Sequence, residues 1–177
     1  MSKPEARLFF RNRAVKNAWP RGSSLWIALV VWGCALASVQ VGAQSAPRPE
    51  QLIKWRQSAY QTISWNTTRI KNALAAGAND TAEVRAAANA LAGVAASGLP
   101  SLFAVGTEKG KGWRETTAAP AVFAEAARFR QLSDDFARDT AQLAKLAAGD
   151  DGKAVREQFL KVAQSCKGCH NQFRQTE

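Results

Sequence analysis

The chain has 177 residues and a formal net charge of +10, and its composition is rich in alanine but holds only 12 glycines and 6 prolines. Such a composition favours helices over strands, and the length suffices for one domain. Six of the 24 basic residues fall in the first 43 positions. No basic stripe interleaved with aromatic residues follows them, so we expect no nucleic acid partner.

Residues 1–43 are predicted to be an export signal peptide that is cleaved. After a basic stretch, Leu25 to Ala37 form an apolar run that is shorter than the ~20 residues a transmembrane helix needs. Val41-Gly42-Ala43 places small residues where a signal peptidase cleaves, so the mature chain should begin at Gln44. We expect it in the periplasm, without membrane association. An uncleaved anchor is the alternative, and Gly33-Cys34 hints at lipoprotein processing.

Four amphipathic helices are predicted in the remaining domain, residues 44–177. They run from about Glu50 to Ala76, from about Asp80 to Ser97, from Pro120 to about Gly149, and from about Gly152 to Arg174. Asp80 with Glu83 is a capping pair for the second, and Asp150-Asp151 caps the last. Only the connection from Leu99 to Ala119 is long. The predicted fold class is therefore all-α, an antiparallel four-helix bundle.

The last predicted helix carries Cys166-Lys167-Gly168-Cys169-His170. C-x-x-C-H is the attachment sequence of c-type haem, whose vinyl groups bond the two thiols while the histidine can ligate the iron. At this spacing the three side chains project from one helix face. Half a zinc site and a redox dithiol are the alternatives. Zinc needs about four ligands, and a thioredoxin-like dithiol expects a βαβ context. We therefore expect one haem c per chain, bound covalently through Cys166 and Cys169.

The same sequence limits the second axial ligand of the iron. His170 is the only histidine, and Met1, the only methionine, leaves with the signal peptide. The usual sixth ligands of low-spin cytochromes are thus missing from the mature chain. A lysine or Tyr60 is the alternative ligand. We expect five-coordinate, high-spin iron that can pass electrons and bind a small gas at its vacant side.

Four short motifs extend this interpretation to essentially all of residues 50–176. They are Lys54-Trp55-Arg56-Gln57-Ser58-Ala59, Trp65-Asn66, Gly106-Thr107-Glu108, and Cys166-Lys167-Gly168-Cys169-His170-Asn171-Gln172-Phe173-Arg174. Through these motifs the chain resembles the cytochromes c′, the class II c-type cytochromes. The resemblance implies that the haem lies inside the bundle, with His170 as the proximal ligand of the iron.

The resemblance also implies roles for residues of the first helix and the tail. Arg56 and Gln57 would contact the haem propionates, Tyr60 would cover the distal face, and Arg174 would lie by the proximal face. For Arg56, a solvated helix residue is the alternative to the propionate contact. Arg174 is equally a complement to a helix C-terminus.

Thr107 and Glu108, in the long connection, are the remaining expected haem contacts. Lys111 stands where the resemblance leads us to expect an acidic or neutral residue. Phe103 is either ordinary core or part of the wall above the haem.

Two functional classes remain open at this point. The first is a periplasmic electron carrier, with periplasmic redox proteins as partners. The second is a protein that binds nitric oxide or carbon monoxide to sequester or sense it. We expect no enzyme, because the sequence offers no paired carboxylates on a face near the haem and no distal base. The resemblance further implies a homodimer formed through the outer faces of the first helix and its neighbour.

Overall fold

The computed structural model describes residues 46–79 and 81–175. The predicted signal peptide and Asp80 lie outside the described residues. The helices are α2 (Pro49–Ala75), α3 (Ala82–Ala95), the short 3-10 helix η1 (Leu99–Leu102), α4 (Ala121–Ala124), α5 (Ala126–Ala147) and α6 (Gly152–Phe173). Within the described ranges there is no strand, only two isolated bridges.

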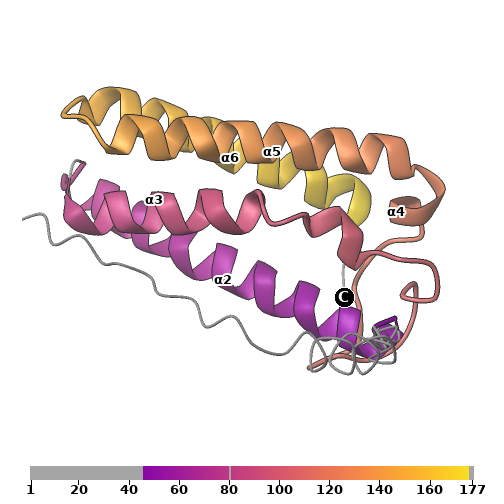
Figure 1. The fold of residues 1–177 in the computed structure, drawn as a ribbon. Coiled ribbons are helices and arrows are strands. Elements are labelled where there is room, and N and C mark those ends of the chain that lie inside the picture. Colours follow the sequence, from indigo (N-terminus) through magenta and orange to yellow (C-terminus); the bar gives the residue numbers. More distant parts are fainter. Residues whose placement is uncertain (1–45, 80, 176–177) are drawn as a thin grey trace, which may run out of the picture. The chain divides into compact units, whose positions relative to one another are not determined.

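The four long helices form the predicted antiparallel bundle, with α2 beside α3 and α5 beside α6 (Figure 1). α3 also packs on α5, which joins the two helix pairs. Their inward stripes form the main core, whose buried members are Ile63, Ile70, Leu74, Val84, Ala87, Ala88, Leu91, Leu99, Leu143, Ala147, Val155, Phe159 and Val162. Burial of these side chains is the principal force holding the helices together.

A second group of apolar side chains lies apart from the main core, and we call it the aromatic cluster. Its buried members are Val122, Phe129 and Phe173, with Phe103, Ala118, Ala121, Phe123, Leu132 and Cys169 packed against them. It brings together α4, α5, the end of α6 and the long connection.

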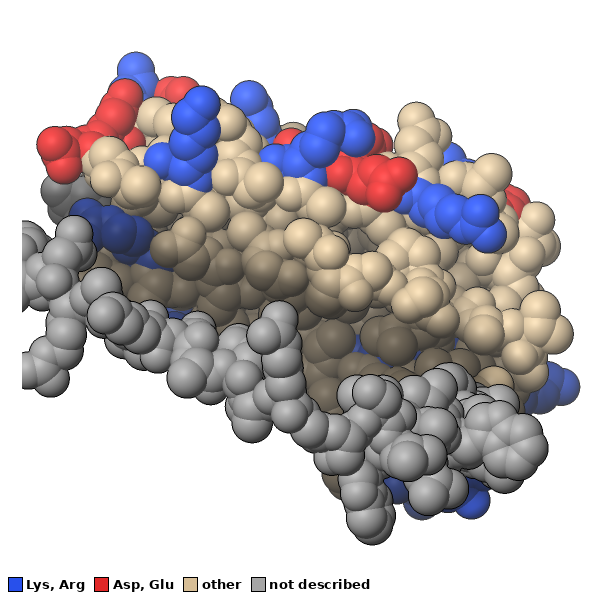
Figure 2. Space-filling view, viewed as in Figure 1, with Lys and Arg blue, Asp and Glu red and all other residues tan. Residues whose placement is uncertain are grey.

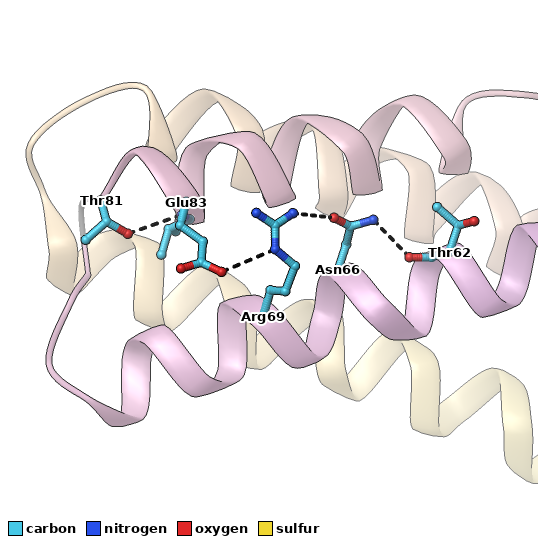
Figure 3. Close-up of polar contacts among 6 residues, drawn as sticks. Thr62, Asn66, Arg69, Thr81 and Glu83 are labelled. Atoms are coloured by element: carbon cyan, nitrogen blue, oxygen red, sulfur yellow. Dashed lines mark hydrogen bonds and ion pairs between the residues drawn. The ribbon is translucent and has the colours of Figure 1, made fainter.

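Side chains fix where the helices begin. The α3 cap is Thr81, one residue later than expected, and its hydroxyl accepts from the Val84 amide at 3.2 Å (Figure 3). Thr81 and Asp80 are both good caps, so the sequence does not distinguish them. The α6 cap is Asp151, as predicted, and it accepts from the Ala154 amide at 2.9 Å.

A polar row joins α2 to α3 near the turn between them. Arg69 pairs with Glu83 at 3.3 Å and also donates to the side-chain oxygen of Asn66 at 3.2 Å. The fully buried Asn66 donates in turn to the Thr62 carbonyl at 2.9 Å (Figure 3). The row satisfies the one polar side chain that α2 buries completely, as a buried amide requires.

The third predicted helix is divided in two. Its first turn forms α4, and Glu125 then leaves helical geometry with φ −113° and ψ 42° before α5 begins. No glycine or proline marks this break in the sequence. Val122 of α4 and Phe129 of α5 are both buried in the aromatic cluster. The break at Glu125 is therefore associated with tertiary packing rather than with a local sequence preference.

Two arginines close the end of the bundle where α2 turns into α3 and α5 turns into α6. Arg156 of α6 donates to the Leu74 carbonyl at 2.6 Å and to the Asn79 side chain at 3.1 Å. Arg85 of α3 donates to the Ala147 carbonyl at 3.1 Å. Both accepting carbonyls belong to the last turn of a helix, where no intrahelical donor is available.

Candidate haem-binding site

The two cysteines of the C-x-x-C-H motif lie on α6 where the two apolar groups meet. Cys166 packs against the main core, and Cys169 packs against the aromatic cluster. Both are half-buried free thiols, and burial raises the pKa of each. A flat, largely apolar group joined to both sulfurs would therefore contact apolar side chains from two halves of the bundle.

His170 follows the cysteines on the same helix and is more exposed than they are. Partial desolvation lowers the pKa of its imidazole, and the nearby positive charge of Arg174 lowers it further. The neutral ring, which is the form that ligates a metal, is thereby favoured. The structure is consistent with His170 as the iron ligand, which stays a prediction.

Tyr60 lies on α2, one turn after Arg56, and its ring packs against the main core. Burial is the largest of the effects that raise the pKa of its phenol above the usual range. Electrostatic effects of Cys169, Arg56 and Cys166 follow, the two thiols raising the pKa and the guanidinium lowering it. The phenol therefore lies on the side of α2 that faces the motif, as the resemblance implies.

A row of aromatic rings continues from Tyr60 towards the motif helix. Edge-to-face pairs join Tyr60 to Phe103 at 6.3 Å, Phe103 to Phe129 at 4.8 Å, and Phe129 to Phe173 at 5.3 Å between ring centroids. These side chains come from α2, the long connection, α5 and α6. They form an apolar wall beside the cysteines, and such pairs add about 0.5–1.5 kcal/mol each beyond their burial.

Arg56 is buried to 3 % exposure, so it is not a solvated residue of the helix surface. Its guanidinium donates to the Thr107 hydroxyl at 2.9 Å, to the Thr107 carbonyl at 2.8 Å and to the Thr116 hydroxyl. It also lies 4.7 Å from the centre of the Phe103 ring. Burial lowers its pKa, an effect that the charges of Tyr60 and Glu108 oppose.

No carboxylate in the described part of the chain lies within ion-pair distance of Arg56. A buried cation of this kind is costly unless an anion is close. The carboxylate of a haem propionate would supply that anion. The buried positive charge of Arg56 therefore fits the expected cofactor. Both terminal nitrogens already donate to protein oxygens, and a direct contact with a propionate stays a prediction.

Gln57 uses both ends of its amide to bind the long connection. Its oxygen accepts from the Trp113 amide at 2.7 Å, and its nitrogen donates to the Arg114 carbonyl at 2.8 Å. A Cβ on Gly112 would lie 2.5 Å from that oxygen and 2.8 Å from the backbone nitrogen of Lys54. Glycine is thus required for the connection to reach α2, and the propionate contact of Gln57 remains a prediction.

The two expected contacts from the connection differ in their surroundings. Thr107 is fully buried as the main partner of Arg56, and its hydroxyl donates to the Ala104 carbonyl at 2.8 Å. Glu108 is exposed and acts on Arg56 through its charge. The backbones of Lys111 and Glu115 form an isolated antiparallel β-bridge. Direct haem contacts of Thr107 and Glu108 remain predictions.

The end of the motif helix pairs with the end of the connection. Ala118 and Arg174 form an antiparallel bridge, in which the Ala119 amide donates to the Phe173 carbonyl at 3.0 Å and the Gln175 amide donates to the Thr117 carbonyl at 2.8 Å. The Arg174 amide also donates to the His170 carbonyl at 3.2 Å. Arg174 therefore lies both at the C-cap of α6 and beside the histidine, so the two interpretations of this residue are compatible.

Comparison with known proteins identifies the family. The sequence profile described as Cytochrome C' matches residues 51–174. The chain belongs to the cytochrome c′ family. It is 44% identical over 130 residues to cytochrome c' of Rhodocyclus tenuis, a match covering 73% of this chain and 98% of that protein. As a member, the chain carries covalently bound haem c with its iron, and Cys166 with Cys169 fits the attachment site.

Solved structures of the family share the fold. A cytochrome c' with an unusual ligand-controlled dimer dissociation is 33% identical, with a TM-score of 0.70, over 75% of this chain and 100% of that one. A nitric oxide complex of a variant of cytochrome c prime from Alcaligenes xylosoxidans is 28% identical, with a TM-score of 0.66, over 75% and 99%. The same protein is also known in a carbon monoxide-bound variant.

Sequence reasoning missed Thr116, which bonds the buried guanidinium from the long connection. Neither periodicity nor a motif distinguishes it from Thr117 beside it. It also missed the break at Glu125. The resemblance did single out Arg56 as a site residue. The structure adds that its guanidinium is buried with no carboxylate of the described residues at ion-pair distance.

Proposed function

We propose that the protein is a periplasmic electron carrier with a five-coordinate, high-spin haem iron. One observation supports five-coordinate iron most. His170 is the only histidine of the chain, and Met1, the only methionine, precedes the described residues. The wall beside the motif consists of Tyr60 and phenylalanines, which are not the usual sixth ligands. The haem supplies an iron that alternates between the ferrous and ferric states.

The residues of the chain have distinct roles in this proposal. Cys166 and Cys169 bind the cofactor covalently, and His170 ligates its iron. Arg56 provides a positive charge for the propionates. Tyr60 excludes water from the vacant side of the iron. We propose a binding and carrier function for the chain rather than an enzyme.

Gas binding is the second candidate, and a specific observation favours it. A vacant iron side beneath an apolar wall suits small uncharged ligands. A family member with the same fold has been solved with nitric oxide and with carbon monoxide. On this alternative the protein sequesters or senses these gases rather than carrying electrons.

Spectra of the purified ferrous protein, with and without nitric oxide or carbon monoxide, test the shared part of both proposals. A high-spin spectrum that either gas converts to a liganded form is expected. A low-spin spectrum without added ligand would show that a side chain fills the sixth position. Reduction by quinol-oxidising partner proteins would then favour the carrier, whereas sensitivity of a deletion strain to nitrosative stress would favour the gas-binding protein.

We also propose that the protein forms a homodimer through the outer faces of α2 and α3. Trp55, Trp65 and Trp113 are 46%, 60% and 69% exposed on or against α2. Trp65 and Trp113 line one groove of about 650 Å³. The surface over α3 is largely without charge (Figure 2). Large exposed apolar patches commonly mark interfaces, and one relative is known for dimer dissociation.

Sedimentation of the wild type and a Trp65→Ser variant at micromolar concentration tests the dimer. Dimers that dissociate in the variant would support it. Leu160→Ser, which changes an exposed apolar residue of α6, is the matched control and should leave the dimer intact. A monomeric wild type would exclude the proposal.

Export to the periplasm rests on the predicted signal peptide. None of the helices in the described residues is long and apolar enough to cross a membrane. Intact mass of the protein from a periplasmic fraction should equal the chain from Gln44 plus one haem. A mass that includes residues 1–43 would contradict this proposal.

A further inference from the structure

We propose that Thr116 is a positioning residue that links the buried Arg56 to the backbone holding His170. The inference rests on the proposed ligation of iron by His170. Four hydrogen-bonded steps connect the two residues, and all of them lie within the described part of the chain. Thr116 is the one side chain in this series whose hydroxyl serves both neighbours.

The first step joins α2 to the connection. Arg56 is held in place by the hydroxyl and the carbonyl of Thr107, at 2.9 and 2.8 Å, and by the ring of Phe103 at 4.7 Å. Its second terminal nitrogen also donates to the Thr116 hydroxyl. A guanidinium fixed on three sides is a rigid reference point for the segment that contains Thr116.

The second step turns the connection towards α6. The oxygen of Thr116 that accepts from Arg56 also accepts from the Ala118 amide at 3.2 Å. A threonine oxygen has two lone pairs and can serve both donors. The turn from 116 to 118 is therefore set by a side chain that is itself set by a buried cation.

The third and fourth steps reach the histidine. Ala118 lies directly opposite Arg174 in the antiparallel bridge, with hydrogen bonds of 3.0 and 2.8 Å on either side. The Arg174 amide then donates to the carbonyl of His170 at 3.2 Å. The last turn of α6 thus rests on residues 117–119, whose course depends on Thr116.

This arrangement gives Thr116 a consequence for the iron site that a surface threonine lacks. In the proposed function, Arg56 on α2 provides a positive charge for the haem propionates, while His170 on α6 ligates the iron. The loss of one hydroxyl would release the segment between them without touching either residue. The orientation of the imidazole would then become less defined, although both thioether bonds stay intact.

Three variants of the haem-loaded protein test the proposal. Thr116→Val removes the hydroxyl at nearly constant volume, and Thr116→Ser keeps it. Thr117→Val is the matched control, because it removes the neighbouring hydroxyl but keeps the carbonyl that accepts from Gln175. Two measurements are made on each: amide hydrogen exchange at Ala119 and Gln175, and the iron–histidine stretching band of the ferrous protein by resonance Raman.

In Thr116→Val, the hydrogens of both amides should exchange about five- to tenfold faster than in wild type, as expected for the loss of a hydrogen bond. The iron–histidine band of this variant should shift or broaden. Thr116→Ser and Thr117→Val should match wild type in both measurements. If Thr116→Val and Thr117→Val behave alike, the proposal is wrong.

Wild-type protein gives a second measurement, which decides the matter if Thr116→Val does not fold. The Ala118 amide should exchange several-fold more slowly than an unstructured peptide, because the Thr116 oxygen accepts from it. Exchange at the free-peptide rate would overturn the proposal. Absence of an iron–histidine band in wild type would instead refute ligation by His170. Neither result depends on electron transfer to a partner.

Discussion

Cys166 and Cys169 are three residues apart on α6, yet they pack against different apolar groups, Cys166 against the main core and Cys169 against the aromatic cluster. The C-x-x-C-H motif therefore lies across the boundary between these groups. A cofactor bonded to both sulfurs would therefore lie next to both the main core and the aromatic cluster.

The first prediction concerns covalent attachment. Replacement of Cys166 and Cys169 together by alanine should leave a haem that acid-acetone extracts, since no thioether would remain. Each single variant, which retains one sulfur, serves as the control and should keep its haem after extraction. Haem that resists extraction from the double variant would refute the attachment.

The second prediction concerns access to the iron. Tyr60→Ala removes a ring that packs against the main core and pairs with Phe103 at 6.3 Å. A gas ligand then no longer has to displace the ring, so the rate of carbon monoxide association should rise while the covalent haem stays in place. Flash photolysis measures this rate. An unchanged rate in the variant would show that Tyr60 does not cover the distal side.

The third prediction follows from the raised pKa of Tyr60. An ordinary tyrosine ionises near pH 10. Above that pH the unfolded chain loses its phenol proton first, so the stability that Tyr60 contributes is present below pH ~10 and is lost as the pH rises. The free energy of unfolding of wild type relative to Tyr60→Phe should be constant from pH 7 to 9. It should then fall by up to about 1.4 kcal/mol per pH unit.

Urea unfolding at several pH values measures this difference, and a difference that is independent of pH up to 11 would contradict it. The same burial opposes a phenolate ligand to the iron. Ferric wild type should therefore show no tyrosinate charge-transfer band at neutral pH by resonance Raman.

The fourth prediction concerns the buried cation. Arg56→Ala removes the bonds to Thr107 and Thr116. The buried Thr107 carbonyl then loses its side-chain donor, whereas the Thr116 oxygen still accepts from the Ala118 amide. The expected loss is about 2–3 kcal/mol of unfolding free energy, because hydrogen bonds to charged groups are among the stronger ones. Arg130→Ala, at an exposed position of α5, is the control and should change stability by less than about 0.5 kcal/mol. Equal effects of the two substitutions would deny Arg56 its structural role.

The fifth prediction compares two glycines. Gly112→Ala would place a Cβ 2.5 Å from the Gln57 oxygen, so the connection must move and stability should fall by about 1–3 kcal/mol. Gly93→Ala, on α3 with no atom within 4 Å of the added carbon, should raise stability by about 0.5–1 kcal/mol. Thermal unfolding of both variants gives the sign of each change. Two changes of the same sign would contradict the packing described here.

Helical periodicity and one motif predict most of this fold, because both depend on residues close in sequence. The four-helix pattern, the cap at Asp151 and the common face of the cysteines follow from local sequence, whereas the cap at Thr81 and the break at Glu125 do not. Burial of Arg56 depends instead on how residues 102–116 fold over α2, and this irregular connection has no periodicity to indicate its course.

Thr116 and Gln57 show the same limit at the level of the site. Thr116 matters because its oxygen accepts from Arg56 of α2 as well as from the nearby Ala118 amide. The residues around Thr116 in the sequence do not indicate the bond to Arg56. The resemblance implies that Gln57 contacts a propionate, and this contact stays a prediction. The sequence does not indicate that the amide of Gln57 also binds the connection from both of its ends.

Arg85 and Arg156 carry a consequence for how the bundle assembles. Arg85 of the α2–α3 pair donates to a carbonyl in the last turn of α5, and Arg156 of the α5–α6 pair donates to a carbonyl in the last turn of α2. The side chains that donate to these two carbonyls thus both come from the opposite pair. We therefore expect the two hairpins to order together, so that the protein behaves as a single cooperative unit even at the end of the bundle farthest along α6 from its haem.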